Sequence, residues 1–118
     1  MRDDQTQRRI AANEIRFREA NEKIREAAVG TEVDPVPFLC ECADPACTQI
    51  VLLTLDRYRS IRANPRLFFD VRGHHLEAIA AGAAVVVEEH DGFVLVEKVG
   101  AAADAAQTAA RGADGEAG

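Results

Sequence analysis

Residues 38–47 read FLCECADPAC and hold all three cysteines of the chain, Cys40, Cys42 and Cys47. In an extended segment, residues two apart point to the same side, so Cys40 and Cys42 share a face. Asp44-Pro45 is a turn-forming pair that can fold the chain back and bring Cys47 toward the other two. Zinc holds thiolates at about 2.3 Å in a tetrahedron, which places neighbouring sulfurs roughly 3.8 Å apart. This spacing can meet that requirement, and the pattern therefore predicts a zinc site.

A tetrahedral zinc site needs a fourth ligand, and the sequence contains no fourth cysteine. Our first choice is His74, because it follows Gly73, whose backbone freedom suits a turn aimed at the metal. The alternatives are His75, then His90, then Asp44 or a water molecule. Four protein ligands would leave no position for a catalytic water, so we expect a structural site and no enzyme.

The cysteines have two alternative roles that stay open. Reduced cysteines often pack in cores as small apolar residues, although Cys47 lies in a polar turn, where this role is harder to explain. An iron–sulfur cluster usually needs four thiolates, one more than the chain has.

No stretch approaches the roughly 20 apolar residues that span a bilayer, and no signal-peptide segment follows the N-terminus. We therefore expect a cytoplasmic protein without membrane partners, in which thiols stay reduced and clustered cysteines more often bind metal.

Outward from the cysteines, the pattern predicts an α+β fold. An N-terminal amphipathic helix is followed by a small, mostly antiparallel sheet with one short helix, stapled by the zinc site. Asp91-Gly92 predicts a tight hairpin, and Thr54 is expected to cap the short helix that begins directly after it. The expected strands are 38–41, 49–53, 67–71, 84–89 and 93–97, of which 49–53 reads as buried on both faces.

Three segments are expected along the chain. Residues 1–29 form the N-terminal helix and residues 30–99 the zinc-stapled α+β domain. Residues 100–118 consist largely of Ala and Gly and have no large apolar side chain, so we expect a disordered tail.

Within the N-terminal helix, Ile10, Phe17 and Ile24 recur every seven residues and form a narrow apolar stripe. The stripe can dock the helix on its own domain. Alternatively, it can meet a protein partner or a second copy of the chain, although so short a repeat does not require a coiled coil.

A basic stretch follows the cysteines and contains five arginines: Arg57, Arg59, Arg62, Arg66 and Arg72. Such a stretch can contact nucleic-acid phosphates, but the chain has a net charge of −6, and no aromatic residues alternate with the arginines for base stacking. Nucleic acid is therefore a possible partner that we do not favour over a solvated face.

Several of these segments together resemble a group of short, uncharacterised actinobacterial-type proteins. The shared motifs are N-E-x-x-F-R-E-x-N-E over residues 13–22, F-x-C-E-C-x-D-x-x-C over residues 38–47, the Gly73-His74 pair and the closing Val96-Glu97-Lys98. This chain departs from the pattern at Arg72, where a proline is expected, and at Leu52, where a polar residue is expected. The resemblance implies a zinc site and names no substrate.

The sequence thus predicts a zinc-binding protein that acts as a non-enzymatic regulatory or protein-interaction module. One alternative is a nucleic-acid-binding zinc module that uses the Arg57–Arg72 stretch. Another is a thiol redox switch in which oxidation releases zinc and frees Cys40 and Cys42. A zinc hydrolase, with Glu41 or Asp44 as the base beside an open metal position, is the least favoured.

Overall fold

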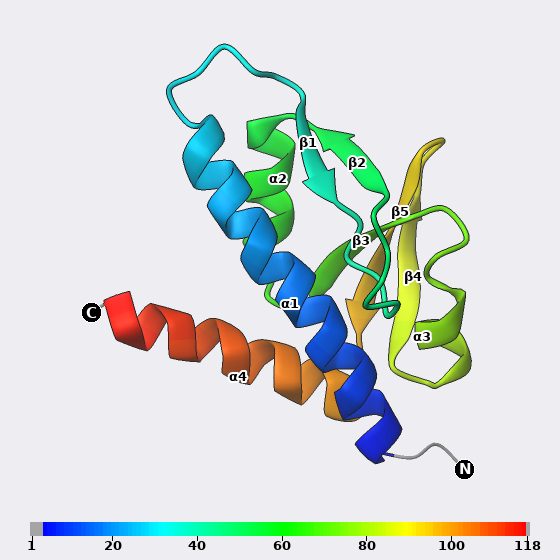
Figure 1. The fold of residues 1–118 in the computed structure, drawn as a ribbon. Coiled ribbons are helices and arrows are strands. Elements are labelled where there is room, and N and C mark those ends of the chain that lie inside the picture. Colours follow the sequence, from blue (N-terminus) through cyan, green and yellow to red (C-terminus); the bar gives the residue numbers. More distant parts are fainter. Residues whose placement is uncertain (1–3, 118) are drawn as a thin grey trace.

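A computed structural model describes the chain from residue 4 to residue 117, with side chains up to residue 111. It is a mixed α+β fold, as predicted, in which long helices lie beside two small antiparallel sheets (Figure 1). The elements are α1 (Asp4–Ala28), β1 (Val36–Leu39), β2 (Ile50–Leu53), α2 (Leu55–Arg62), β3 (Leu67–Val71), α3 (Leu76–Ala80), β4 (Ala84–Glu89), β5 (Phe93–Lys98) and α4 (Gly100–Ala117).

The local signals for turns and caps are confirmed. The Thr54 hydroxyl accepts a hydrogen bond from the Arg57 backbone N–H at 3.1 Å and so caps the start of α2. Strands β4 and β5 pair, and the His90 N–H donates to the Phe93 carbonyl at 2.9 Å. This bond closes the chain around Asp91-Gly92 and makes the tight hairpin that the sequence predicts.

The larger sheet has the order β3-β5-β4, and the smaller one pairs β1 with β2. Because side chains alternate along a strand, the larger sheet buries two different faces. Phe68 and Val96 on one face pack with Ile10 of α1 and Ala102 and Ala106 of α4. The larger sheet therefore lies between these helices on one side and the smaller sheet with α2 on the other.

The second face of the larger sheet carries Phe69 and Leu95, which pack with residues of β1, β2 and α2. Phe38 stacks on Tyr58 with ring centroids 4.2 Å apart, and Phe69 meets both rings edge-on. This aromatic group fixes β1, and with it the start of the cysteine segment, against β3.

Strand β2 is buried on one face only, so the prediction of burial on both faces was wrong. Val51 and Leu53 are buried, whereas Ile50 and Leu52 are 52% and 58% exposed. The apolar run is continuous, but no described element covers its outer face.

The prediction of a disordered tail over residues 100–118 was also wrong. Residues 100–117 form helix α4, and Ala102, Ala103 and Ala106 are buried where α4 packs against α1 and the sheet. Alanine has the highest helix propensity, and its small side chain lets two helices approach closely. The segment therefore needs no large apolar residue in order to dock; residue 118 lies outside the described residues.

Helix α1 docks through a face that is more polar than the predicted stripe. Ile10 is buried, but Phe17 and Ile24 are only partly buried. The remaining buried positions follow helical spacing and are Gln7, Ala11, Glu14, Arg18, Asn21 and Ala28. Buried polar side chains need partners, and those of α1 find them on the sheet, on α4, on the cysteine segment and on the loops after α2 and α3. These partners decide how α1 is oriented.

Candidate metal centre

The cysteine segment leaves β1 and is held by backbone bonds on both sides. The Cys40 N–H donates to the Gln49 carbonyl of the β2 approach, and the Glu41 N–H donates to the Phe69 carbonyl of β3, both at 2.9 Å. This keeps the segment extended, so that Cys40 and Cys42 share a side while Glu41 points the other way.

Asp44 folds the segment back, as its sequence predicts. Its carboxylate accepts from the Ala46 N–H at 2.9 Å, and its carbonyl accepts from the Cys47 N–H at 3.1 Å. The turn returns Cys47 to the side that Cys40 and Cys42 already occupy.

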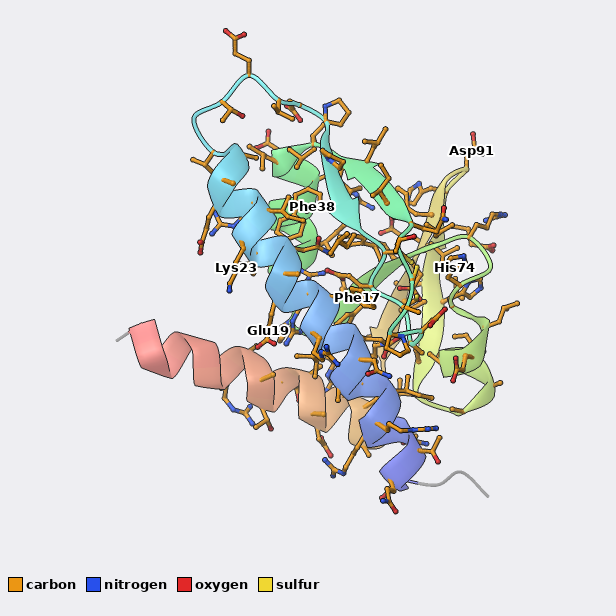
Figure 2. The ribbon with its side chains drawn as sticks, viewed as in Figure 1. Phe17, Glu19, Lys23, Phe38, His74 and Asp91 are labelled. Atoms are coloured by element: carbon orange, nitrogen blue, oxygen red, sulfur yellow. The ribbon has the colours of Figure 1, made fainter. Side chains whose placement is uncertain are left out.

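His74 lies on the loop between β3 and α3, which leaves the end of β3 that the cysteine segment contacts (Figure 2). Gly73 has a φ of +94°, a conformation that L side chains rarely adopt, and the His74 N–H donates to the Val71 carbonyl at 2.8 Å. The resulting tight turn directs the imidazole to the three thiols.

The four predicted ligands come together with metal-site spacing. One ligand atom from each of Cys40, Cys42, Cys47 and His74 lies within 4.8 Å of all the others. His74 Nδ1 is 3.6 Å from Cys40 Sγ and 3.5 Å from Cys47 Sγ. A tetrahedral zinc ion with ordinary Zn–S and Zn–N bonds gives an S···N separation of about 3.6 Å. The cluster can therefore hold a metal ion through Nδ1 of His74 with little rearrangement.

The other two histidines do not join this group. His90 lies in the hairpin, where its Nε2 is 2.9 Å from the Glu88 carboxylate and its ring stacks on Phe93. His75 lies directly before α3 and contributes no atom to the cluster.

The protein around the thiols already favours one negative charge. The Cys40 thiol donates a hydrogen bond to Cys42, which lowers the pKa of Cys42 to about 5. The same hydrogen bond and burial raise the pKa of Cys40, and burial raises the pKa of Cys47. The Val71 N–H also donates to Cys40 Sγ at 3.2 Å. A divalent cation would supply the positive charge that the other two thiols need in order to ionise.

Glu41, between two of the ligands, is part of the core and cannot serve as a base. Its carboxylate is fully buried and receives two bonds from Arg62, at 2.8 and 3.0 Å. The Asn21 amide and the Phe69 N–H donate to it at 2.9 and 3.3 Å. The sequence does not reveal this role, because a charged residue between two cysteines usually faces solvent.

Two asparagines of α1 hold the backbone of the metal loop. The Asn21 side chain donates to the Leu39 carbonyl at 2.9 Å and accepts from the Leu39 N–H at 2.8 Å. Asn13 donates to the Ala43 carbonyl at 3.1 Å. The spacing of the two asparagines, eight residues or about two helical turns, was the signal that could have revealed this contact.

The basic stretch is taken up by ion pairs within the chain. Each of its five arginines has a carboxylate oxygen within 3.9 Å: Arg57–Glu88, Arg59–Asp56, Arg62–Glu41, Arg66–Glu97 and Arg72–Glu89. Phosphate groups that approached this stretch would have to compete with these carboxylates.

Comparisons of the chain with protein-family models, with curated proteins and with solved structures gave no match. Among the described residues, no helix has the length and apolar character that a membrane crossing requires. The function is therefore inferred from the geometry of the site alone.

Proposed function

We propose that this protein binds one zinc ion through Cys40, Cys42, Cys47 and His74. The observation that carries the proposal is the distance of 3.5–3.6 Å from His74 Nδ1 to two of the sulfurs, which matches the edge of a zinc tetrahedron. Three thiolates with one imidazole are a common ligand set for structural zinc, whereas iron–sulfur clusters usually take four thiolates.

The zinc ion has a structural role in this proposal. Its ligands come from two segments, the loop after β1 and the loop after β3, which belong to different sheets. A bond through the metal would tie these sheets together in a protein whose core is small. With four protein ligands the ion has no open position, and Glu41 is engaged by Arg62, so the proposed module is not an enzyme.

The regulatory or interaction role follows from what the metal loop borders. Phe17, Leu39 and Pro45 line a hollow of about 220 Å³ between α1 and the loop. Figure 2 shows Phe17 on the side of α1 that faces this loop. Of the predicted stripe, Ile10 is buried and Ile24 packs against the core beside Phe38, so Phe17 is the stripe residue that borders this hollow and that a protein partner can reach there. Zinc would fix one wall of this hollow, and metal loading would therefore control partner binding there.

Metal analysis of the purified protein tests the zinc site. We expect close to one zinc per chain, unchanged in His75→Ala and strongly reduced in His74→Ala. His75→Ala is the matched control, because the two histidines are neighbours in sequence and only His74 belongs to the cluster. Equal zinc content in both variants would refute the assignment of the fourth ligand, and absence of metal after expression with added zinc would refute the site.

A redox switch is the second candidate, supported by the partial exposure of Cys47 beside two other thiols. Hydrogen peroxide would oxidise two zinc-bound thiolates to a disulfide, with two protons and the peroxide giving two waters and the zinc ion released. Zinc release measured with a chromogenic chelator at micromolar peroxide would support this candidate, and retention of zinc would exclude it.

A further inference from the structure

Strand β4 forms an open edge of the larger sheet and exposes a row of valines. Within the described part of the chain, β5 is its only pairing partner. Val85, Val86 and Val87 are 46%, 38% and 44% exposed, and only Ala84 of the strand is buried. Figure 1 shows the strand between α3 and the hairpin tip. Such an edge is a ready template for another strand.

Only a short part of the β4 backbone, residues 84–86, has hydrogen-bonding groups that a partner strand can use. The Val99 N–H donates to the Ala83 carbonyl, which directs that carbonyl toward β5. Since antiparallel ladders alternate, the N–H and C=O groups of Ala84 and Val86 point to the free side. The register with β5 shifts between Val86 and Glu88, so the regular edge ends at Val86.

The usual protection of an edge strand is missing from this range. Natural edge strands often carry a lysine or a proline that blocks pairing. Residues 84–87 are Ala-Val-Val-Val and contain neither. The bulge after Val86 limits the length of a pairing but leaves the three preceding residues regular.

Charge indicates which strand fits this edge. Glu88 and Glu89 follow the valines, but they pair with Arg57 at 2.7 Å and Arg72 at 3.3 Å in the same chain. These two ion pairs reduce, without removing, the attraction of the glutamates for a charged strand, and the best complement to the valines is another apolar strand.

A second copy of β4 supplies that strand when it lies antiparallel, with the two-fold axis at Val85. Ala84 of each chain then lies opposite Val86 of the other, and their free backbone groups can exchange hydrogen bonds. Glu88 lies opposite Gly82 of the other copy, away from both glutamates. A parallel arrangement would set each Glu88 against its equivalent, which like-charge repulsion disfavours.

We propose that β4 is a self-association surface, at which a second copy of this chain adds its β4 antiparallel and joins the two larger sheets into one continuous sheet. This surface differs from the predicted helix stripe and does not depend on the metal.

Sedimentation of the full, zinc-supplemented chain tests the proposal. Runs at up to about 1 mM protein detect a dimer with a Kd near 1 mM or tighter. Val85→Lys sets two lysines against each other at the two-fold axis and should raise the Kd by at least about tenfold. Each lysine still faces Glu97 of its own β5, so the fold should tolerate it. Leu52→Lys, at an apolar residue of β2 with 58% exposure, is the matched control and should leave the Kd unchanged.

A mixture gives the sharper test. Val85→Lys and Val85→Glu should each be monomeric and should form a one-to-one heterodimer when mixed. Val85→Glu sets a glutamate opposite Glu97 of its own β5, so its fold is first checked by circular dichroism. Val86→Pro removes an outward N–H without touching the bonds to β5 and should also abolish the dimer. A monomer at every concentration would overturn the proposal, and so would a dimer that is insensitive to the Val85 variants, since this result would place the interface on another surface.

Discussion

Glu14 of α1 is fully buried against the larger sheet, where it forms an ion pair with Lys98 of β5. Burial raises its pKa from 4.5 to about 7, although Lys98 acts in the opposite direction. Negative charge on Cys42 and Glu41 adds to the rise. Asp70 of β3 is also fully buried, and burial and then the Glu14 charge raise its pKa well above the ordinary value. Glu14 therefore keeps its proton in the folded protein at a pH at which the unfolded chain releases it.

This pKa difference fixes the sign and size of a pH effect on stability. The rise from 4.5 to about 7 corresponds to about 3 kcal/mol, at about 1.4 kcal/mol per pKa unit. Because the folded pKa is the higher one, the contribution of the proton is fully present below pH 4.5 and is lost as the pH rises through about 7. Gln at position 14 is neutral throughout. The stability advantage of the native protein over Glu14→Gln should therefore fall by up to about 3 kcal/mol between about pH 5 and pH 8.

Urea unfolding followed by circular dichroism at several pH values measures this difference. Protonation of the metal ligands changes both proteins in the same direction, so most of its effect is removed when the two free energies are subtracted. Glu26→Gln, at an exposed position of the same helix, is the control and should give a constant offset from the native protein. Parallel stability curves for the native protein and Glu14→Gln, or an advantage that grows with pH, would refute the reasoning.

Three further substitutions probe the anchor, the turn and the last helix. Arg62→Met removes the bidentate partner of the buried Glu41 and should cost about 3–5 kcal/mol in urea unfolding; a cost below about 1 kcal/mol would show that the carboxylate finds other compensation. Gly73→Ala adds a Cβ at a φ of +94° with no atom within 4 Å, so backbone strain alone should cost about 1–2 kcal/mol of folding stability. The same strain should weaken zinc binding in competition titrations, and unchanged zinc affinity would show that the loop rearranges freely. Ala106→Glu buries a charge between α1 and α4 and should cost at least about 2 kcal/mol of folding stability, whereas Thr108→Glu, at an exposed position, should be nearly neutral. Equal melting temperatures for these two variants would mean that α4 is not docked.

Most of the strands, the capped helix and the metal cluster could be predicted because their signals are local. The Cys40–Cys47 spacing, the Asp44 turn and the glycine before His74 each prescribe a backbone geometry within a few residues. The choice of His74 over its neighbour could be made from the same turn, since only the residue directly after Gly73 is aimed by it.

Contacts between distant segments could not be predicted. The docking of α4 depends on a matching surface of α1 that includes Ile10 and Ala11, and the Ala-rich composition by itself suggested disorder. The buried face of α1 carries Glu14, Arg18 and Asn21, and a hydrophobic period cannot reveal a face whose partners are single polar groups on other elements. The sequence also did not reveal that one face of β2 is exposed, because a run of apolar residues does not indicate whether another element covers it.

The polar face of α1 connects the metal centre to the core through hydrogen bonds. Asn21 bonds the backbone of Leu39, one residue before the first ligand, and also bonds Glu41, which lies between the first two ligands. Arg62 brings α2 into the same group through Glu41. A metal ion that fixes Cys40 and Cys42 thereby fixes the carboxylate between them, and through it the positions of both helices. Loss of the ion should thus loosen α1 and α2 before it disturbs the β4–β5 hairpin, and amide exchange should rise first at Asn21 and Arg62 on addition of a chelator.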